Sequence, residues 1–132
     1  MKTILLVEDD PIIVQVYREP LKKRGFQVEV AEDGLVAMKG LLQWRPDLVV
    51  LDVMMPKVDG PYVLKYLRSR PELKDTKVIV LSNASIADAA KATLAQNPEA
   101  VFLKSQCTPK LLAEKINDLL GLESPAAPPP PP

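Results

Sequence analysis

Acidic side chains follow two apolar runs of this sequence, where they could take part in chemistry. Glu8 and Asp9 come directly after residues 3–7, and Asp52 comes directly after residues 48–51. Three carboxylates that lie close together repel one another, so such a site either keeps a proton or binds a cation. An anionic, oxygen-rich site suits Mg²⁺ better than a soft metal, and Mg²⁺ is commonly shared with substrate phosphate. The acids therefore predict a Mg²⁺ site that also takes a phosphoryl group.

Two more polar side chains end later apolar runs. Ser82 follows residues 77–81, and Lys104 follows residues 100–103. A hydroxyl and an ammonium are groups that hold phosphoryl oxygens. With Asp52 as the nucleophile, the set predicts phosphoryl transfer by positioning and charge neutralisation, through an acyl phosphate on Asp52.

Each of these residues also has a simpler explanation. Glu8 or Asp9 could cap a helix, although Asp10 fits that role better. Ser82 could bond to loop backbone, and Lys104 could be an ordinary solvated lysine. Phosphoryl transfer is favoured because four of the five predicted strands end in groups suited to one chemistry.

The elements that must position these groups alternate along the chain. Continuous apolar runs bounded by proline or turn residues, such as Pro56 and Asp59-Gly60, are typical of strands buried on both faces of a parallel sheet. Strands are predicted at residues 3–7, 26–31, 48–51, 77–81 and 100–103. Helical spacing and caps predict helices at residues 11–24, 35–44, 61–69, 86–95 and 109–120. The last of these helices is expected to place Leu111, Leu112, Ile116, Leu119 and Leu120 on one face.

This alternation predicts an α/β fold. We expect a flavodoxin-like five-stranded parallel sheet of order 2-1-3-4-5, with helices on both faces and right-handed crossovers. In this order the carboxyl ends of strands one and three lie side by side, where such sheets carry their sites. Glu8, Asp9 and Asp52 then share one crevice. The second strand, which ends without a suitable group, is the sheet edge away from it.

Prolines mark two further features. Pro20 falls inside the first helix, so a kink or an early end near Glu19 is expected, with Gly25 closing any further turn. Residues 122–132 are rich in proline and end in five prolines. They are expected to be polyproline II or disordered, and to act as a linker, a tail or a ligand for proline-reading domains. The predicted domain is residues 1–121.

Length and composition exclude several classes of site. The 132 residues are enough for one domain. With 17 basic and 17 acidic residues, the net charge of zero gives no overall attraction to nucleic acid or anionic membrane. The lack of histidine and the single Cys107 exclude a zinc motif, a disulfide framework and histidine-dependent catalysis. No apolar run approaches the roughly 20 residues of a membrane span. No signal peptide is evident, so a cytoplasmic location is expected.

Four motifs together resemble the receiver domain of two-component response regulators, of the chemotaxis-regulator kind. They are LLVEDD at residues 5–10, VLDVMMP at 50–56 with Asp59-Gly60, Leu81-Ser82, and FLK at 102–104. The resemblance covers residues 1–121.

The resemblance implies a role for each site residue. Asp52 would accept phosphate from a histidine kinase or a phosphotransfer protein. Ser82 would supply the switch hydroxyl, and Lys104 would pair with the phosphate. The Mg²⁺ ligands would be Glu8, Asp9, Asp52 and the backbone carbonyl of Met54.

The implied output is a switched protein-interaction surface rather than an enzymatic cycle. The only reactions expected are Mg²⁺-dependent self-phosphorylation from a phosphodonor and autodephosphorylation. The fourth helix, fifth strand and fifth helix, from about residue 86 to residue 120, would bind a downstream protein. We expect a monomer or weak homodimer without direct contact to nucleic acid or membrane. No effector domain fits in the remaining residues, so the chain is expected to be a stand-alone receiver or one cut from a longer regulator.

Several positions depart from the family pattern. Ser105 stands where the family usually has a proline, often with a cis bond. Val101 stands where an aromatic switch residue is usual, and Phe102 comes one place later, on the opposite sheet face. Asn83 replaces a small residue, and Pro20 in the first helix is atypical, as is the lack of Gly-Ala before the fifth strand. These departures concern the output mechanism more than the chemistry.

Three other functions remain as alternatives. The main one is a pseudo-receiver, an interaction module of the same fold that acts without phosphorylation. A flavodoxin-like FMN carrier would need a loop rich in Ser, Thr or Gly after the first strand, where Glu8, Asp9 and Asp10 would repel a phosphate. A phosphohydrolase of the haloacid-dehalogenase type would need a second aspartate where Met54 stands.

Overall fold

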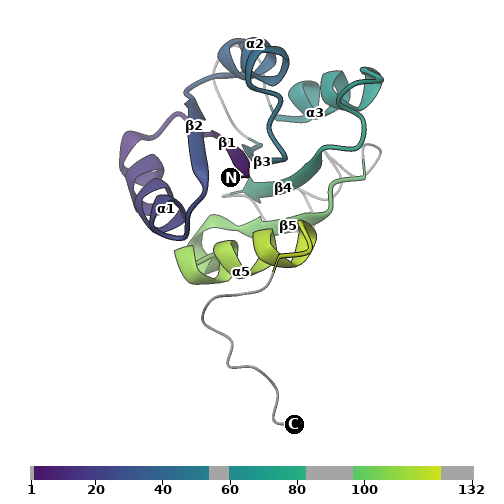
Figure 1. The fold of residues 1–132 in the computed structure, drawn as a ribbon. Helices are drawn as coiled ribbons and strands as arrows, with labels where there is room; N and C mark the ends of the chain where they lie inside the picture. Colours follow the sequence, from purple (N-terminus) through teal and green to yellow (C-terminus); the bar gives the residue numbers. More distant parts are fainter. Residues whose placement is uncertain (1, 54–59, 83–96, 123–132) are drawn as a thin grey trace, which may run out of the picture.

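The computed structural model describes residues 2–53, 60–82 and 97–122. Its sheet has five parallel strands in the order β2-β1-β3-β4-β5, which is the predicted order (Figure 1). The strands are β1 (Thr3–Val7), β2 (Gln27–Ala31), β3 (Leu48–Asp52), β4 (Lys77–Ser82) and β5 (Ala100–Leu103). The described helices are α1 (Pro11–Lys23), α2 (Gly34–Trp44), α3 (Gly60–Ser69), α5 (Pro109–Leu119) and the short 3₁₀ helix η2 (Lys104–Gln106).

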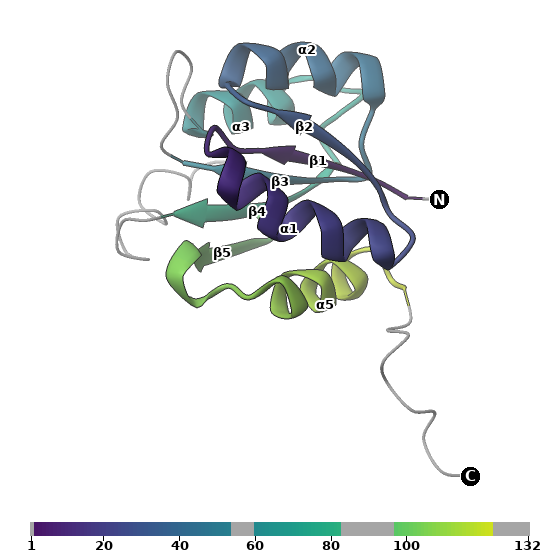
Figure 2. The same cartoon turned by 90° about the vertical axis from the view of Figure 1, so that its left-hand side faces the viewer.

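Helices cover both faces of the sheet, as predicted. Figure 2 shows α2 and α3 on one face and α1 and α5 on the other. Successive strand residues alternate between two hydrophobic clusters, with Leu5 in the α2–α3 cluster and Leu6 in the α1–α5 cluster. Val101 and Phe102 pack on opposite faces in the same way, as expected. Because both faces are covered, every residue of β3 is buried, which explains its continuous apolar run.

The first helix continues through its proline. Of the predicted alternatives, the early end near Glu19 is wrong, because α1 runs through Pro20 to Lys23, and the further turn before Gly25 is present. Pro20 lies in the last turn of α1. Its missing N–H removes one helical hydrogen bond, and little of the helix follows it that the proline could disturb. Burial of Leu21, which is 1% exposed, stabilises that turn. Gly25 follows with a φ of 93°, a left-handed conformation that ends the helix.

Side-chain caps set the starts of three helices. The capping oxygens accept backbone N–H groups at 2.9 Å for Asp10, 2.9 Å for Asp33 and 3.1 Å for Thr108. In α5 the prediction for Leu111 is wrong, because this side chain is 39% exposed. Leu111 does not belong to the buried face of α5. This face consists of Leu112, Ala113, Ile116 and Asn117.

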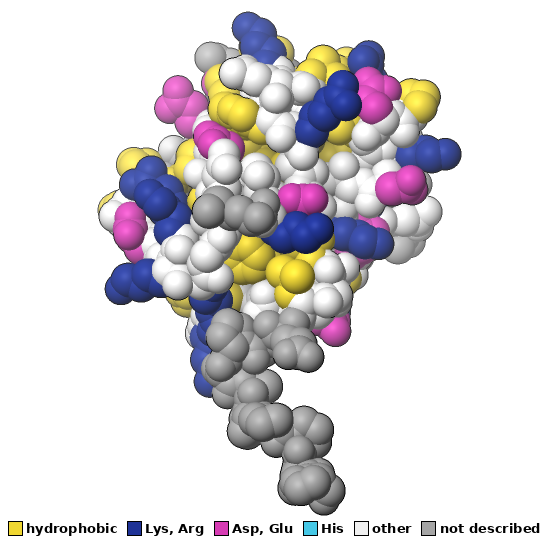
Figure 3. Space-filling view, viewed as in Figure 1, with side chains coloured by type: hydrophobic (Ala, Val, Ile, Leu, Met, Phe, Trp, Pro, Cys, Tyr) yellow, Lys and Arg dark blue, Asp and Glu magenta, His cyan; other side chains and the backbone are white. Residues whose placement is uncertain are grey.

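Some sequence predictions fall outside the described residues. They concern the helix at residues 86–95, Met54, Asn83 and all but the first residue of the proline-rich tail. Among the helices that the structure describes, none is long and apolar enough to cross a membrane. The molecular face in Figure 3 carries both basic and acidic side chains, which agrees with the net charge of zero.

Candidate functional site

Three acidic side chains meet at the carboxyl ends of β1 and β3. The two strands pair in register up to Val7 and Leu51, so the residues that follow them are neighbours. Glu8, Asp9 and Asp52 each offer a carboxylate oxygen, and these oxygens all lie within 4.8 Å of one another. Glu8 is 1% exposed and Asp52 is 2% exposed. The predicted acidic cluster is therefore present, and its one exposed member is Asp9.

Glu8 is held on both sides by the backbone. Its N–H donates to the carbonyl of Ala31 at 3.0 Å, and its Oε1 accepts the N–H of Asp10 at 3.1 Å. Burial raises the pKa of the Glu8 carboxyl, and the charge of Asp52 raises it further, although a hydrogen bond from Lys104 opposes them. Asp10, and not Glu8, caps the start of α1, so the Glu8 side chain is available to the acidic cluster.

Lys104 lies between two of the acids. Its Nζ is 2.7 Å from Glu8 Oε2 and 2.9 Å from Asp52 Oδ2, and its side chain is 9% exposed. Burial acts to lower the pKa of Lys104, but hydrogen bonds to Glu8 and Asp52 outweigh it and raise this pKa above its usual value. The lysine is therefore a largely shielded ammonium paired with two acids, rather than the solvated side chain of the simpler explanation.

Ser82 ends the strand between Asp52 and Lys104. In the sheet register Leu81 pairs with Asp52, and Ser82 pairs with Leu103, the residue before Lys104. Ser82 is fully buried. The structure thus brings Glu8, Asp9, Asp52 and Lys104 together and places Ser82 at the same sheet edge, while Met54 lies outside the described residues.

Gly60 is a site residue for which the sequence suggested only turn chemistry. Its N–H donates to the Val53 carbonyl at 3.0 Å. A Cβ at this position would lie 2.5 Å from the backbone oxygen of Asp52 and 2.7 Å from Val53 Cα. Only glycine allows the start of α3 to approach the end of β3 this closely. The position next to a turn aspartate gave no sign of this contact, because it depends on tertiary packing.

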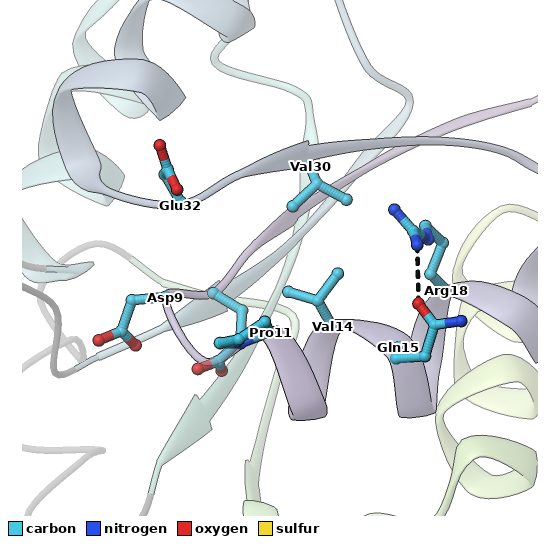
Figure 4. A pocket seen from close by; sticks show the side chains of 8 residues that line it. Asp9, Pro11, Val14, Gln15, Arg18, Val30 and Glu32 are labelled. Carbon is cyan, nitrogen blue, oxygen red and sulfur yellow. Dashed lines mark hydrogen bonds between the residues drawn. The ribbon is translucent and has the colours of Figure 1, made fainter.

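A surface groove opens beside the acids. It has a volume of about 290 Å³ and runs between α1 and the end of β2. Figure 4 shows the carboxylates of Asp9 and Glu32 toward one end and Arg18, hydrogen-bonded to Gln15, toward the other. The groove is lined by Glu8, Asp9, Pro11, Val14, Gln15, Arg18, Val30 and Glu32. Of the acidic cluster, the groove exposes Asp9 to solvent.

The order of the sheet, the acidic cluster and the buried lysine agree with the resemblance noted in the sequence. The sequence profile of the response regulator receiver domain matches residues 4–117. The chain belongs to this family. Receiver domains are in general signalling modules rather than conventional enzymes, and this chain is a receiver domain of that class.

Known relatives agree with this assignment. The response regulator MprA of Mycobacterium sp. (strain KMS) is 36% identical over 122 residues, which are 92% of this chain and 52% of the relative. The receiver domain therefore spans about half the length of the curated relatives it matches.

Solved structures share the fold. The signal receiver domain of a histidine kinase from Syntrophus aciditrophicus has a TM-score of 0.84 and 30% identity, covering 92% of this chain and 91% of that one. The Mn²⁺-bound form of response regulator Rcp1 has a TM-score of 0.78 and 30% identity, covering 97% of this chain and 99% of that one.

The described acids fit a divalent cation. Receiver domains bind Mg²⁺ in an acidic pocket, and three carboxylate oxygens within 4.8 Å of one another form such a pocket here. Within the described part of the chain, the buried Oε2 of Glu8 pairs with Lys104 Nζ at 2.7 Å. Carboxylate oxygens are ligands suited to a hard cation such as Mg²⁺.

Proposed function

We propose that this receiver domain accepts a phosphoryl group on Asp52 in a Mg²⁺-dependent two-component phosphorelay. One observation carries the proposal: the Asp52 carboxylate lies 2.9 Å from the partly buried ammonium of Lys104 and beside two further carboxylates. This arrangement neutralises charge around an incoming phosphoryl group and positions a nucleophile for in-line attack.

The transfer step is balanced without a further reactant. A carboxylate oxygen of Asp52 forms a bond to phosphorus as the bond between phosphorus and the leaving group breaks. The leaving group keeps the electron pair, either as the imidazole nitrogen of a phosphohistidine or as the carboxylate of an acyl phosphate. The product is an acyl phosphate on Asp52.

The other site residues would bind Mg²⁺ or contact the phosphoryl oxygens. Bound Mg²⁺ would supply charge neutralisation at the phosphoryl oxygens. Glu8, Asp9 and Asp52 would hold it, with the backbone carbonyl of Met54. The Lys104 ammonium would move from the carboxylates to a phosphoryl oxygen, and the Ser82 hydroxyl would donate to another.

The donor in this proposal is a histidine kinase or a phosphotransfer protein. The added charge would draw Lys104 and Ser82 toward the phosphate and shift the population of an interaction surface that includes β5 and α5. A downstream protein would read that surface. Residues 1–121 would form the switch, and the proline-rich residues 122–132 would act as a linker or tail.

A direct test uses Mg²⁺ binding and phosphotransfer together. Calorimetric titration should detect Mg²⁺ binding to the wild type and weaker binding to Asp9→Asn, since Asp9 is the exposed acid. Radiolabelled phosphate from acetyl phosphate should enter the protein with Mg²⁺ and not with EDTA. Labelling that is equal with and without Mg²⁺ would contradict the proposal.

The rival function is a phosphorylation-independent pseudo-receiver. The burial of Asp52 to 2% exposure is the observation that favours it, since a nucleophile must be reached. A pseudo-receiver would bind no Mg²⁺ at millimolar concentration and would take no label from acetyl phosphate.

A further inference from the structure

A buried hydrogen bond joins the two segments that carry the site. The Tyr17 hydroxyl donates to the carbonyl oxygen of Cys107 at 2.6 Å, across 90 residues of sequence. Tyr17 is 3% exposed and Cys107 is 4% exposed. Tyr17 belongs to α1, which starts two residues after Asp9, and Cys107 lies three residues after Lys104.

The turn after Lys104 is short, and it ends at the buried Cys107. It is a single 3₁₀ turn closed by a long hydrogen bond of 3.4 Å from Cys107 N–H to the Lys104 carbonyl. Ser105 and Gln106 are exposed. No proline ring restricts the backbone between Lys104 and Thr108. The short bond from Tyr17 therefore acts together with the burial of Cys107 to fix where this turn lies.

The hydroxyl also lies within electrostatic reach of the acids. Burial raises the pKa of Tyr17, and the charges of Cys107 and Glu8 add to this effect. Glu8 is the acid that contacts Lys104 at 2.7 Å. Tyr17 thus bonds the lysine turn and lies within electrostatic reach of Glu8.

We propose that Tyr17 is a positioning residue for phosphoryl transfer, which acts by holding the Lys104 turn against α1. Its bond to Cys107 keeps the Lys104 ammonium between Glu8 and Asp52. The inference rests on the proposed function of Asp52. The Lys104 ammonium must meet the transferred phosphoryl group, so even a small displacement of this charge lowers the rate of transfer. Loss of the Tyr17 hydrogen bond should therefore slow phosphorylation of Asp52 on the order of tenfold.

The test is a double-mutant cycle on the rate of phosphorylation by acetyl phosphate at saturating Mg²⁺. Tyr17→Phe removes the hydroxyl and keeps the buried ring. It should slow the wild type about tenfold and leave the Lys104→Met background within about twofold, because a residue that acts through Lys104 has nothing left to position. An unchanged rate, or equal slowing in both backgrounds, would overturn the inference.

A matched control separates positioning from loss of stability. Ile116→Val removes one methyl group from the same hydrophobic cluster, at a fully buried position of α5. Its effect on stability should resemble that of one lost hydrogen bond. It should phosphorylate at the wild-type rate, and slowing equal to that of Tyr17→Phe would overturn the inference.

A second measurement does not depend on phosphorylation. The NMR signals of the Lys104 Cε methylene should move toward those of an exposed lysine in Tyr17→Phe without Mg²⁺, and unchanged signals would overturn the positioning role. If the wild type takes no phosphoryl group, the function proposed for Asp52 fails, and these signals alone decide whether Tyr17 positions Lys104.

Discussion

Lys104 Nζ lies 2.9 Å from Asp52 Oδ2, and the two residues come from the ends of β5 and β3 with β4 between them. The same ammonium contacts Glu8 at 2.7 Å. With every group ionised, the three carboxylates and one ammonium leave two net negative charges. Since removing one partner leaves a buried charge uncompensated, the lysine and the acids depend on one another.

Removing the lysine should strengthen cation binding. In Lys104→Met no ammonium competes for Glu8 and Asp52 or repels a divalent ion, so Mg²⁺ affinity should rise on the order of tenfold. Calorimetric titration measures this change. The control is Lys115→Met, which removes a partly exposed lysine paired with Asp118 at 3.6 Å, outside the acidic cluster. Unchanged or weaker Mg²⁺ binding in Lys104→Met would show that the ammonium does not oppose the metal.

Gly60→Ala should destabilise the fold next to the nucleophile. The added Cβ meets backbone atoms of Asp52 and Val53, which cannot move aside as a side chain would. We expect a loss of about 1–3 kcal/mol in urea denaturation. In Gly40→Ala the new methyl meets only the Trp44 side chain, so its loss should be smaller. Equal stability of Gly60→Ala and wild type would refute the close approach.

Tyr17 should make the protein sensitive to alkali. Burial raises the pKa of its hydroxyl above the usual value of about 10. Below pH 10 the group is neutral in both states. As the pH rises further the unfolded chain loses the proton first, so the free energy of unfolding falls.

Denaturation in urea from pH 8 to pH 11 measures this effect. Tyr17→Phe should lose less stability over that range than the wild type, because other groups titrate equally in both. Parallel curves for the two proteins would mean that the hydroxyl ionises as easily when folded as when unfolded.

Arg68 should stabilise the connections on both sides of β4. Its guanidinium donates to the carbonyl of Thr76 at 2.6 Å and to Glu99 Oε1 at 2.8 Å, and it bonds two further carbonyls. Arg68→Ala should cost about 2–4 kcal/mol in thermal or urea unfolding. Arg70→Ala, which breaks an exposed pair with Glu72, should cost much less stability than Arg68→Ala. Similar losses for both variants would contradict the role given to Arg68.

The sequence predicts the central strands of the sheet well because they are buried on both faces. Runs such as residues 48–51 have no polar interruption, and strand order then places Glu8 beside Asp52. The ends of elements follow local chemistry, as at Asp10, where a cap is visible in the sequence. The early end of α1 near Glu19 does not occur, because burial of Leu21 outweighs the local effect of proline.

Contacts between distant segments could not be predicted in this way. The sequence places Lys104 at the correct sheet edge but does not indicate that it bridges two acids. The bond between Tyr17 and Cys107 has no local signature, since a tyrosine at helical spacing is expected only to pack its ring. The close approach of Gly60 likewise depends on where α3 docks.

The most direct measurement is the intact mass of the protein after incubation with Mg²⁺ and acetyl phosphate, with Asp52→Asn beside it. The wild type should gain one phosphoryl group, and Asp52→Asn should gain none while keeping its fold by circular dichroism. A wild type without added mass, or an Asp52→Asn variant that gains the same mass, would contradict phosphorylation of Asp52.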